Sequence, residues 1–270
     1  MQKRINGVTI IMPAYNAEAT INQAIQSVIK QSYAAWELIV IDDKSCDKTS
    51  SIVQSFITND PRIRLISNQQ NKGVSVSRNI GVALAQYQWI AFLDSDDYWE
   101  QDKLSKQIEA LQEHKDCKLC FTGTRYLCSG GDLSHYTLQV PSKVFGEDIL
   151  RQNVISCSSV LVEKEALLRN PMPNIRTLHE DLATWYKILK SENKESASYA
   201  VGINEPLLVY RLSSSGKSGN KLKSAVMQWK TYRYLGISFF KSVACFISYV
   251  VRNVNKYRKI RKQGGGLAQI

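Results

Sequence analysis

Along the first hundred residues, short runs of apolar residues alternate with segments in which apolar residues recur every three or four positions. A continuous run of four or five apolar residues is typical of a strand that is buried on both faces of a parallel sheet. A spacing of three or four is typical of an amphipathic helix. The pattern predicts strands over Val8–Met12, Leu38–Ile41, Arg62–Ile66 and Trp89–Leu93, and helices over 21–29, Ser50–Ile57 and Gly73–Ala85.

This regular exchange of strands and helices predicts an α/β fold with an open, mainly parallel, twisted sheet and flanking helices. In such sheets, ligands bind beyond the carboxyl ends of the strands. Three polar or aromatic clusters follow predicted strands, namely Pro13-Ala14-Tyr15, Asp42-Asp43 and Asp94-Ser95-Asp96. We therefore expect a ligand site at this edge of the sheet.

The regular alternation ends after a predicted helix over Leu104–His114. Beyond it, the pattern predicts strands over Lys118–Leu127, Ser156–Val162 and Leu207–Tyr210, a helix over Leu182–Leu189, a loop over Cys128–Pro141 and a flexible link over Ser213–Gly219.

The positive charge of the chain is concentrated near its C-terminus. The 270 residues carry a formal net charge of +11, but twelve of the 35 lysine and arginine residues lie in 217–270, where the sequence has no acidic residue. The rest of the chain holds 23 basic and 24 acidic residues and is close to neutral. This distribution argues against a basic nucleic-acid-binding module, which would also leave the carboxylate clusters unexplained.

Three carboxylates end the strand that is predicted over Trp89–Leu93: Asp94, Asp96 and Asp97. Carboxylates this close repel one another unless a positive charge lies between them, and the usual partner is a divalent cation with oxygen ligands. Because side chains alternate along an extended segment, Asp94 and Asp96 point to the same side. The Asp-Ser-Asp segment therefore predicts a clamp for Mn2+ or Mg2+ and a diphosphate.

The common phosphate-binding loops do not occur at the predicted strand ends. No Gly-x-Gly-x-x-Gly follows a strand in the first half, and Gly216-Lys217-Ser218 lacks the upstream strand and glycine of a P-loop. If this sheet binds a nucleotide, it does so with carboxylates, an aromatic face and a metal.

Four segments together resemble the family-2 inverting glycosyltransferases, which have the nucleotide-sugar-binding GT-A fold. They are Val8–Asn16, Asp42–Ser45, Asn71–Asn79 and Phe92–Asp97, in the order and spacing of that family. The resemblance covers roughly residues 6–212. It implies a GT-A domain over 1–212, with a nucleotide-binding part over 1–97 and an acceptor and base part over 98–212, followed by a linker and an amphipathic, basic helical tail over 213–270.

The resemblance implies that the nucleotide is bound by Pro13, Ala14, Tyr15, Asp43, Arg78, Asp94 and Ser95. Tyr15 would stack on the base, and Asp43 would accept a hydrogen bond from the N–H of a uracil ring. Arg78 would contact the ribose or the phosphates. The alternatives are that Tyr15 is a packing residue, that Asp42-Asp43 caps the following helix, and that Arg78 is a surface arginine.

The same resemblance implies that Asp96 binds the metal, helped by Asp94 through the ribose or a metal-bound water. Asp97 would hold the loop or contact sugar hydroxyls. The alternative for Asp97 is that it caps the helix that is predicted over Leu104–His114.

The predicted helix in the second half opens with His179-Glu180-Asp181, where the family usually has an acidic pair. The resemblance implies that Asp181 is the general base, with Glu180 beside it as a second catalytic acid. A carboxylate that removes the proton of an acceptor hydroxyl accelerates the reaction roughly 10²–10⁴-fold. The alternative is that the two acids only interact with the helix dipole.

The last predicted strand is followed by Arg211, where the family has an arginine and small polar residues that close over the diphosphate. Arg211, Ser213 and Lys217 are the implied diphosphate-binding residues, since a departing diphosphate needs positive charge and hydrogen-bond donors. Many relatives have a histidine near position 213, often close to the metal. Ser213 stands here instead, which argues against a metal ligand from this side. Ser156–Ser159 lies where family members line the sugar or acceptor pocket.

The tail combines an apolar, aromatic-rich segment, Leu235–Val251, with six basic residues within Arg252–Lys262. The apolar segment is interrupted by Lys241 and is short for a spanning helix, which needs ~20 residues. An apolar face beside a cationic cluster is typical of a helix at an anionic membrane surface. We expect peripheral membrane contact through this tail; the alternative is a helix packed on the catalytic domain.

We therefore expect a metal-dependent, inverting enzyme that transfers a hexose or N-acetylhexosamine from a UDP-sugar to a sugar hydroxyl. The resemblance and the tail together imply a lipid-linked saccharide acceptor in bacterial O-antigen or capsule synthesis, and no nucleic-acid partner. The apolar stretch near the N-terminus is too short for a signal peptide, so we expect a cytoplasmic protein at the inner face of the membrane. The alternatives are the nucleic-acid-binding module and a catalytically inactive, sugar-nucleotide-binding partner subunit.

Overall fold

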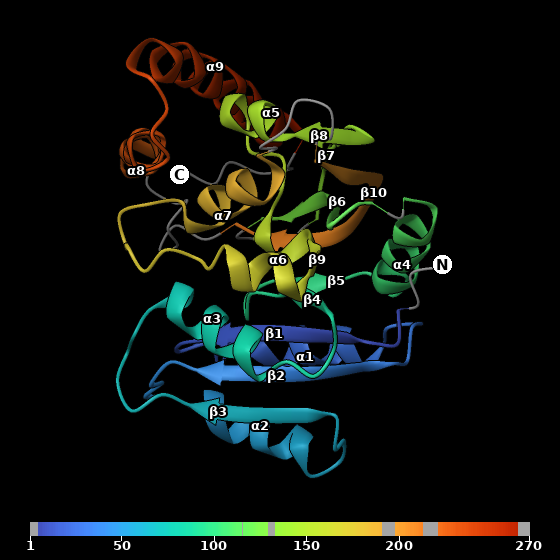
Figure 1. Cartoon of the computed structure of the whole chain (residues 1–270). Coiled ribbons are helices and arrows are strands. Elements are labelled where there is room, and N and C mark those ends of the chain that lie inside the picture. The colour runs from blue at the N-terminus through green and yellow to red at the C-terminus, as the bar shows by residue number, and fades with distance from the viewer. Residues whose placement is uncertain (1–4, 115, 129–132, 191–197, 213–220, 264–270) are drawn as a thin grey trace.

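The fold is described by a computed structural model, which covers residues 5–114, 116–128, 133–190, 198–212 and 221–263 (Figure 1). Its strands are β1 (Val8–Ala14), β2 (Trp36–Asp42), β3 (Ile63–Ser67), β4 (Trp89–Phe92), β5 (Tyr98–Trp99), β6 (Leu119–Leu127), β7 (Leu133–Leu138), β8 (Lys143–Phe145), β9 (Leu161–Glu163) and β10 (Tyr199–Arg211). Its helices are α1 (Ile21–Ile29), α2 (Thr49–Ile57), α3 (Val74–Leu84), α4 (Lys103–Glu113), α5 (Gly146–Arg151), α6 (Lys164–Arg169), α7 (Glu180–Leu189), α8 (Lys221–Tyr234) and α9 (Phe239–Gln263), with a 3-10 turn over Cys157–Ser159.

The strands form one sheet in the order β3-β2-β1-β4-β9-β6-β10-β5, with β7 beside β6 and β8 beside β10. β1 pairs in parallel with β2 and β4, β2 pairs in parallel with β3, and β6 pairs in parallel with β10. β9 joins the two parallel parts, since it runs antiparallel to both β4 and β6. The prediction of an α/β fold with a mainly parallel sheet and flanking helices is confirmed.

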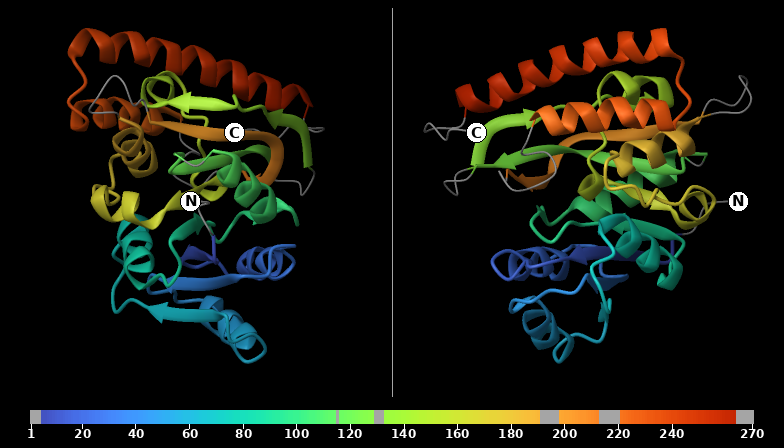
Figure 2. Two further views of the ribbon diagram at one scale, coloured as in Figure 1. Left: turned by 45° about the vertical axis from the view of Figure 1, so that its right-hand side comes forward. Right: turned by 90° about the vertical axis from the view of Figure 1, so that its left-hand side faces the viewer.

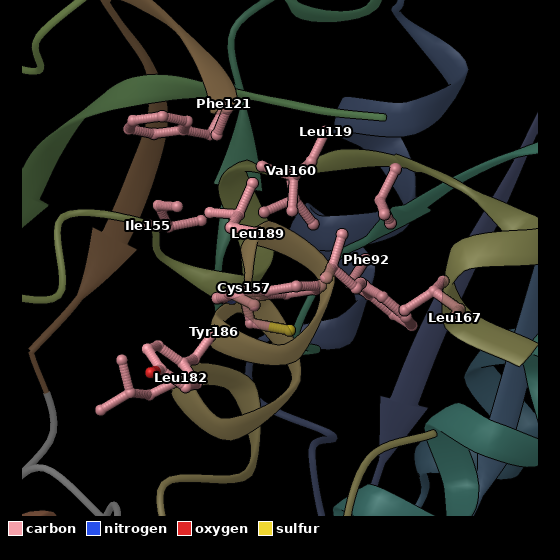
Figure 3. Close-up of a cluster of buried hydrophobic side chains, with 14 of the residues drawn as sticks. Phe92, Leu119, Phe121, Ile155, Cys157, Val160, Leu167, Leu182, Tyr186 and Leu189 are labelled. Carbon is pink, nitrogen blue, oxygen red and sulfur yellow. The ribbon is translucent and has the colours of Figure 1, made fainter. Parts of the chain in front are cut away.

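The first strand, β1, explains why helices cover both faces of the sheet. Val8, Ile10 and Met12 belong to a core cluster with residues of α1 and α4, whereas Ile11 belongs to a second cluster with residues of α3 and α7. Because side chains alternate along a strand, a continuous apolar run faces both layers. Gly81 allows α3 to approach closely, since a Cβ there would lie 2.5 Å from Ile11. Figure 1 shows α1 and α3 on opposite sides of the sheet, and Figure 3 shows part of the second cluster around α7.

The second half of the sheet differs from the sequence-based prediction at several strands. The segment predicted as a strand over Ser156–Val162 is a 3-10 turn followed by the short β9, because the Ser156 carbonyl accepts hydrogen bonds from the backbone N–H (2.9 Å) and hydroxyl (2.7 Å) of Ser159. The loop predicted over Cys128–Pro141 contains β7, which pairs antiparallel with β6. The strand predicted over Leu207–Tyr210 is the 13-residue β10, whose length follows from its pairing with β6 and β8.

The two C-terminal helices, α8 and α9, pack on the rest of the molecule. Tyr232, Ile237 and Cys245 are buried in the same core cluster as residues of α7. Lys241 on α9 forms an ion pair of 2.6 Å with Glu147 on α5. Figure 2 shows α9 running past α5 and β7 at one edge of the molecule. Within the described ranges, no helix has the length and apolar character needed to span a bilayer.

Candidate functional site

A pocket of about 410 Å³ lies beyond the carboxyl ends of β1, β2 and β4. Its volume is within the range of small-molecule sites, roughly 300–1,000 Å³. The pocket is lined by Pro13, Ala14, Tyr15, Asn16, Ala17, Asp43, Val74, Ser77, Asp94, Ser95, Asp96 and Arg211. All three clusters that the sequence places after strands therefore contribute to one cavity.

The loops that follow β1 and β2 are fastened to each other. The backbone N–H of Asp43 donates to the Ala14 carbonyl (2.8 Å), and the backbone N–H of Asn16 donates to Ser45 Oγ (3.0 Å). Asn16 adopts a positive φ of 48°, and its Oδ1 accepts from the backbone N–H of Cys46 (2.9 Å). This network fixes the backbone around Tyr15, whose side chain remains 52% exposed at the pocket. Tyr15 is therefore available for stacking, and the alternative that it is a packing residue is wrong.

The carboxylate of Asp43 is buried and firmly held at the start of α3. It accepts hydrogen bonds from the backbone N–H of Lys72 (2.9 Å), from that of Gly73 (2.7 Å) and from Asn68 Nδ2 (2.8 Å). The alternative that Asp43 caps α2 is wrong, because Asp47 Oδ1 accepts the backbone N–H of Thr49 at the start of that helix (2.9 Å). Asp42 has a structural role there: its Oδ2 accepts from Ser50 Oγ (2.5 Å).

Arg78 connects the pocket to the helix that carries the predicted base. Its guanidinium donates to Asp94 Oδ1 (2.5 Å) and to Glu180 Oε1 (3.3 Å), and its side chain is 4% exposed. The alternative of a surface arginine is therefore wrong. Both ion pairs point its charge at protein carboxylates, so a contact between Arg78 and a nucleotide stays a prediction. The Asp94–Arg78–Glu180 chain joins β4, α3 and α7.

The other two carboxylates after β4 have different environments. Asp96 opens into the pocket, and its pKa is raised to about 6, first because its surroundings reduce its hydration and second because Asp94 repels it. Asp97 is buried, and its Oδ1 accepts from the backbone N–H of Arg211 (3.0 Å). Burial and the charges of Asp96 and Asp94 raise the pKa of Asp97 well above its ordinary value. Asp97 therefore holds the loop to β10, and the alternative that it caps α4 is wrong.

Arg211 is placed at the rim of the pocket by the end of β10. Its Nε donates to the backbone carbonyl of Asp96 (3.1 Å), and its Nη2 donates to Gln23 Oε1 (2.7 Å). These bonds hold the positively charged guanidinium of Arg211 beside the acidic cluster. The other two predicted diphosphate-binding residues, Ser213 and Lys217, lie outside the described residues, as does the predicted link that contains them.

The acidic cluster offers only some of the ligands that a metal ion needs. Within the described residues, no group of three or more histidine, cysteine, aspartate or glutamate side chains is arranged to hold a metal ion. Asp96 is open to the pocket, while Asp94 is shared with Arg78. This donor set fits Mn2+ or Mg2+, which typically bind through one or two carboxylates and fill their remaining positions with phosphate oxygens and water.

Asp181 lies in the first turn of α7, beside the charge chain. Its Oδ1 accepts from the backbone N–H of Leu182 (2.7 Å), and its Oδ2 lies 3.5 Å from Asn153 Nδ2. The pKa of Asp181 is raised, mainly by burial and then by the charge of Glu180, against the opposing effects of His179 and Arg78. A carboxylate with a raised pKa accepts a proton more readily than a solvated one, which suits a general base. Asp181 does not line the pocket. Its neighbour Glu180 is linked to the pocket residue Asp94 by the ion pairs that both form with Arg78.

Two residues that support the site are not apparent as such from the sequence. Ser158 Oγ accepts from the backbone N–H of Asp94 (3.1 Å), and its carbonyl accepts from Trp99 Nε1 (2.7 Å). The resemblance places Ser158 in a pocket-lining segment, but its observed contacts are to the backbone that carries the acidic cluster. Asn153 lies 28 positions from its partner Asp181, and no sequence spacing marks it.

Comparisons with known proteins show the family of this chain. Residues 9–160 match the family model described as glycosyl transferase family 2. A relative from Bacillus subtilis (strain 168), named putative teichuronic acid biosynthesis glycosyltransferase TuaG, is 38% identical over 250 residues, which are 92% of this chain and 96% of the relative. A relative from Escherichia coli, named UDP-Glc:alpha-D-GlcNAc-diphosphoundecaprenol beta-1,3-glucosyltransferase WfgD, is 34% identical over 257 residues, which are 95% of this chain and 97% of the relative.

Solved structures share the fold at lower identity. S. aureus TarS 1-349 in complex with UDP-GlcNAc has a TM-score of 0.66 and 20% identity, over 86% of this chain and 66% of that chain. The mannosyltransferase PcManGT from Pyrobaculum calidifontis, in complex with GDP-Man and Mn2+, has a TM-score of 0.65 and 16% identity, over 98% of this chain and 78% of that chain. The chain therefore belongs to glycosyl transferase family 2 and is a glycosyltransferase with the GT-A fold.

Proposed function

We propose that this enzyme transfers a hexose or N-acetylhexosamine from a UDP-sugar to a hydroxyl of a lipid-linked saccharide. The observation that carries the proposal is the charge chain Asp94–Arg78–Glu180, which joins the pocket at the strand ends to the helix turn that holds Asp181. One side of this chain offers a donor site with carboxylates and an exposed tyrosine, and the other offers a base.

The donor would occupy the pocket, with the uracil ring on Tyr15. The N–H of the ring would donate to Asp43, whose carboxylate is already oriented by the backbone N–H groups of Lys72 and Gly73. The backbone of Pro13 and Ala14 and the loop at Ser95 enclose the same space. A carboxylate acceptor at this position favours uracil over bases that present a lone pair there instead of an N–H, because the carboxylate would repel that lone pair.

Transfer would proceed by one displacement at the anomeric carbon. Asp181 takes the proton of the acceptor hydroxyl while the hydroxyl oxygen forms a bond to the anomeric carbon. At the same time the bond between that carbon and the diphosphate breaks, and its electron pair leaves with UDP. Attack from the face opposite the leaving group converts an α-linked donor into a β-linked product. Glu180 is held by Arg78, so we assign proton removal to Asp181 and orientation of the acidic pair to Glu180.

The departing diphosphate needs compensating positive charge. Asp96 and Asp94 would hold Mn2+ or Mg2+, and the cation would neutralise the charge that develops on the diphosphate. Arg211 is already fixed at the pocket rim and would add a charge-assisted donor. Ser213 and Lys217 follow it in the sequence and are proposed to contact the same group.

The acceptor class rests on similarity. The relative from Escherichia coli acts, by its name, on a GlcNAc-diphosphoundecaprenol, and the relative from Bacillus subtilis is named for teichuronic acid biosynthesis. We infer a diphospholipid-linked saccharide as the acceptor, with O-antigen, capsule or a related surface polysaccharide as the product. Such an acceptor places the enzyme in the cytoplasm, at the inner face of the membrane.

We further infer that α9 makes the membrane contact. Phe240, Ile247, Val251 and Val254 recur at helical spacing on one face of α9 and are 85%, 60%, 54% and 43% exposed. We call these four residues the α9 stripe. An exposed apolar stripe on a helix beside cations is typical of binding to an anionic bilayer.

The basic residues of α9 divide between packing and exposure. Lys241 pairs with Glu147, Arg252 donates to Gln152 Oε1 (3.2 Å), and the Lys256 ammonium lies 5.0 Å from the centre of the Tyr126 ring. Arg258 and Lys259 are exposed at the end of the helix. The membrane contact is therefore proposed to combine the α9 stripe with its C-terminal cations. The packing of α8 and α9 on the catalytic core supports the alternative that the tail is a helix packed on the catalytic domain. In this proposal one face of α9 packs on the core and the opposite face contacts the membrane.

The proposal is tested by UDP release with a panel of UDP-sugars and a GlcNAc-diphospholipid acceptor. We expect acceptor-dependent release with UDP-glucose, UDP-galactose or one of their N-acetyl forms, in the presence of Mn2+ or Mg2+, and its loss in EDTA. Turnover that persists in EDTA would remove the metal role. Release with GDP-mannose but with none of the UDP-sugars would overturn the donor assignment.

A further inference from the structure

We propose that helix α8 positions Asp181 by holding two segments beside it, the residues just before Asp181 and the segment that carries Asn153. The C-terminal helices would then support the catalytic base. This inference rests on the proposed role of Asp181 as the base. Two separate groups of hydrogen bonds carry it, one to the segment that precedes Asp181 and one to the segment whose side chain contacts its carboxylate.

The first group holds His179, two residues before Asp181. The backbone N–H of His179 donates to Thr231 Oγ1 (3.0 Å), and the imidazole Nε2 lies 3.1 Å from the Ser224 carbonyl. Ser224 Oγ is 3.3 Å from the same nitrogen and 3.2 Å from Tyr249 Oη on α9. Both the backbone and the side chain of the residue at the start of α7 are therefore fixed by α8.

The second group acts through the segment after α5. Tyr232 Oη donates to the Leu150 carbonyl (2.5 Å), at the end of that helix. Three residues later, Asn153 Nδ2 faces the Asp181 carboxylate, and Asn153 Oδ1 accepts from the backbone N–H of Ile155 (3.1 Å). The tyrosine thus supports the stretch of chain from which Asn153 reaches Asp181.

Burial makes these contacts specific. Thr231 and Tyr232 are fully buried, and Ser224 is 9% exposed, so water does not replace a lost partner at these positions. The Thr231 hydroxyl also donates to the Met227 carbonyl (2.8 Å), which leaves its lone pairs directed at the His179 N–H. A serine can make both bonds, whereas a valine of nearly the same shape can make neither.

Position matters for Asp181 because proton removal requires a hydrogen bond to the acceptor hydroxyl at the moment of reaction. The groups that set its environment are Glu180 and His179 on its own segment, Arg78 from α3 and the Cys157 thiol from the 3-10 turn. α8 contributes none of these groups itself and acts by holding the backbone and the ring of His179 in place. A displacement of about 1 Å of a reacting group can cost on the order of 10²-fold in rate.

The test compares Thr231→Val with Thr231→Ser in the full chain, using kcat, the KM for the UDP-sugar and the Kd for UDP. We expect Thr231→Val to lower kcat by about 10-fold or more while KM and Kd stay within about 2-fold, because the donor pocket is untouched. Thr231→Ser should restore kcat. Thr184→Val is the matched control: Thr184 is buried on α7, its hydroxyl has no hydrogen-bond partner among the described residues, and its replacement should leave kcat unchanged.

The outcomes separate this inference from the proposed function. Thr231→Val with a normal kcat, or with a loss that Thr184→Val shares, would overturn the role of α8. If Thr231→Val does not fold, Tyr232→Phe and Ser224→Ala carry the same expectation, and normal kcat in both would overturn it as well. Full activity of Asp181→Asn would instead overturn the base assignment itself.

Discussion

Arg78 is the residue whose environment differs most from what its position on a helix suggests. Its charge is shared between Asp94 and Glu180, which come from positions 16 and 102 residues away and would otherwise repel each other. A buried ion pair of this kind is not a large net source of stability, but its disruption removes the positive charge that compensates Asp94 and Glu180.

We therefore predict that Arg78→Met lowers the free energy of unfolding by about 3 kcal/mol, the lower end of the range for breaking a buried pair, because Asp94 is 30% exposed. Urea denaturation followed by circular dichroism measures this change in the free energy of unfolding. Arg169→Met is the control, since its pair with Glu165 is on the surface, and it should cost less than about 1 kcal/mol. Equal losses in the two variants would contradict the structural role of Arg78.

The raised pKa of Asp181 predicts the pH dependence of the reaction. A base works in its ionised form, so activity is present above its pKa and is lost as the pH falls through it. Because burial and Glu180 raise this pKa from 3.8, the acidic limb of kcat/KM should lie above the pH at which a solvated aspartate titrates. A pH–rate profile measures this limb. A limb near pH 4 or below would contradict the environment described for Asp181.

The same shift has a consequence for stability. A carboxyl group whose folded-state pKa is raised favours folding only while it is protonated, and that contribution is lost as the pH rises through the folded pKa. At neutral pH, the ionised Asp181 therefore lowers the free energy of unfolding. Asp181→Asn should melt at the same temperature as the wild type or at a higher one. A clear decrease in Tm would show that Asp181 stabilises the fold, contrary to this account.

At the scale of elements, the sequence predicts best those whose burial is determined locally. β1, β2, β3 and β4 were predicted to within two residues at each end. β1, β2 and β4 are buried along their whole length, so their apolar runs are continuous, whereas β3 lies at the edge of the sheet and is only partly buried. α3 was predicted from Gly73, which has a positive φ of 89° just before the helix.

Elements that exist through tertiary pairing were missed. β7 carries a polar sequence between Leu133 and Leu138, and it forms because β6 offers an edge. β8 has only three residues and forms against β10. Among the site residues, the clusters at strand ends were predictable from topology, whereas the pairing of Arg78 with Glu180 depends on packing between distant helices.

The C-terminal helices show the same limit, and they give a prediction at this scale. The sequence indicates an amphipathic tail, but not that Tyr232, Ile237 and Cys245 complete the core beside α7. We predict that a chain ending at residue 219 loses cooperative thermal unfolding, because it leaves this apolar surface exposed and the Leu150 carbonyl without its partner. An unchanged melting transition would mean that α8 and α9 are separable from the core.

At the scale of the whole molecule, the location of the exposed apolar side chains decides how the membrane contact can be tested. Deletion of the tail is a poor test, since α8 and α9 belong to the core. Point variants on the solvent-facing side of α9 avoid this problem.

We predict that Ile247→Asp lowers binding to phosphatidylglycerol-containing vesicles at least about 3-fold, because it places a charge in the α9 stripe. Flotation of the full chain measures it. Leu168→Asp is the matched control, since Leu168 is 54% exposed on α6, outside the stripe, and its replacement should not change binding. Equal vesicle binding by the wild type and Ile247→Asp would contradict the membrane role.

The most direct test of the central claim compares UDP release by the wild type and Asp181→Asn on a GlcNAc-diphospholipid acceptor at saturating donor. The account predicts that Asp181→Asn binds UDP with the affinity of the wild type and turns over at least ~10²-fold more slowly. Wild-type turnover by Asp181→Asn would contradict it.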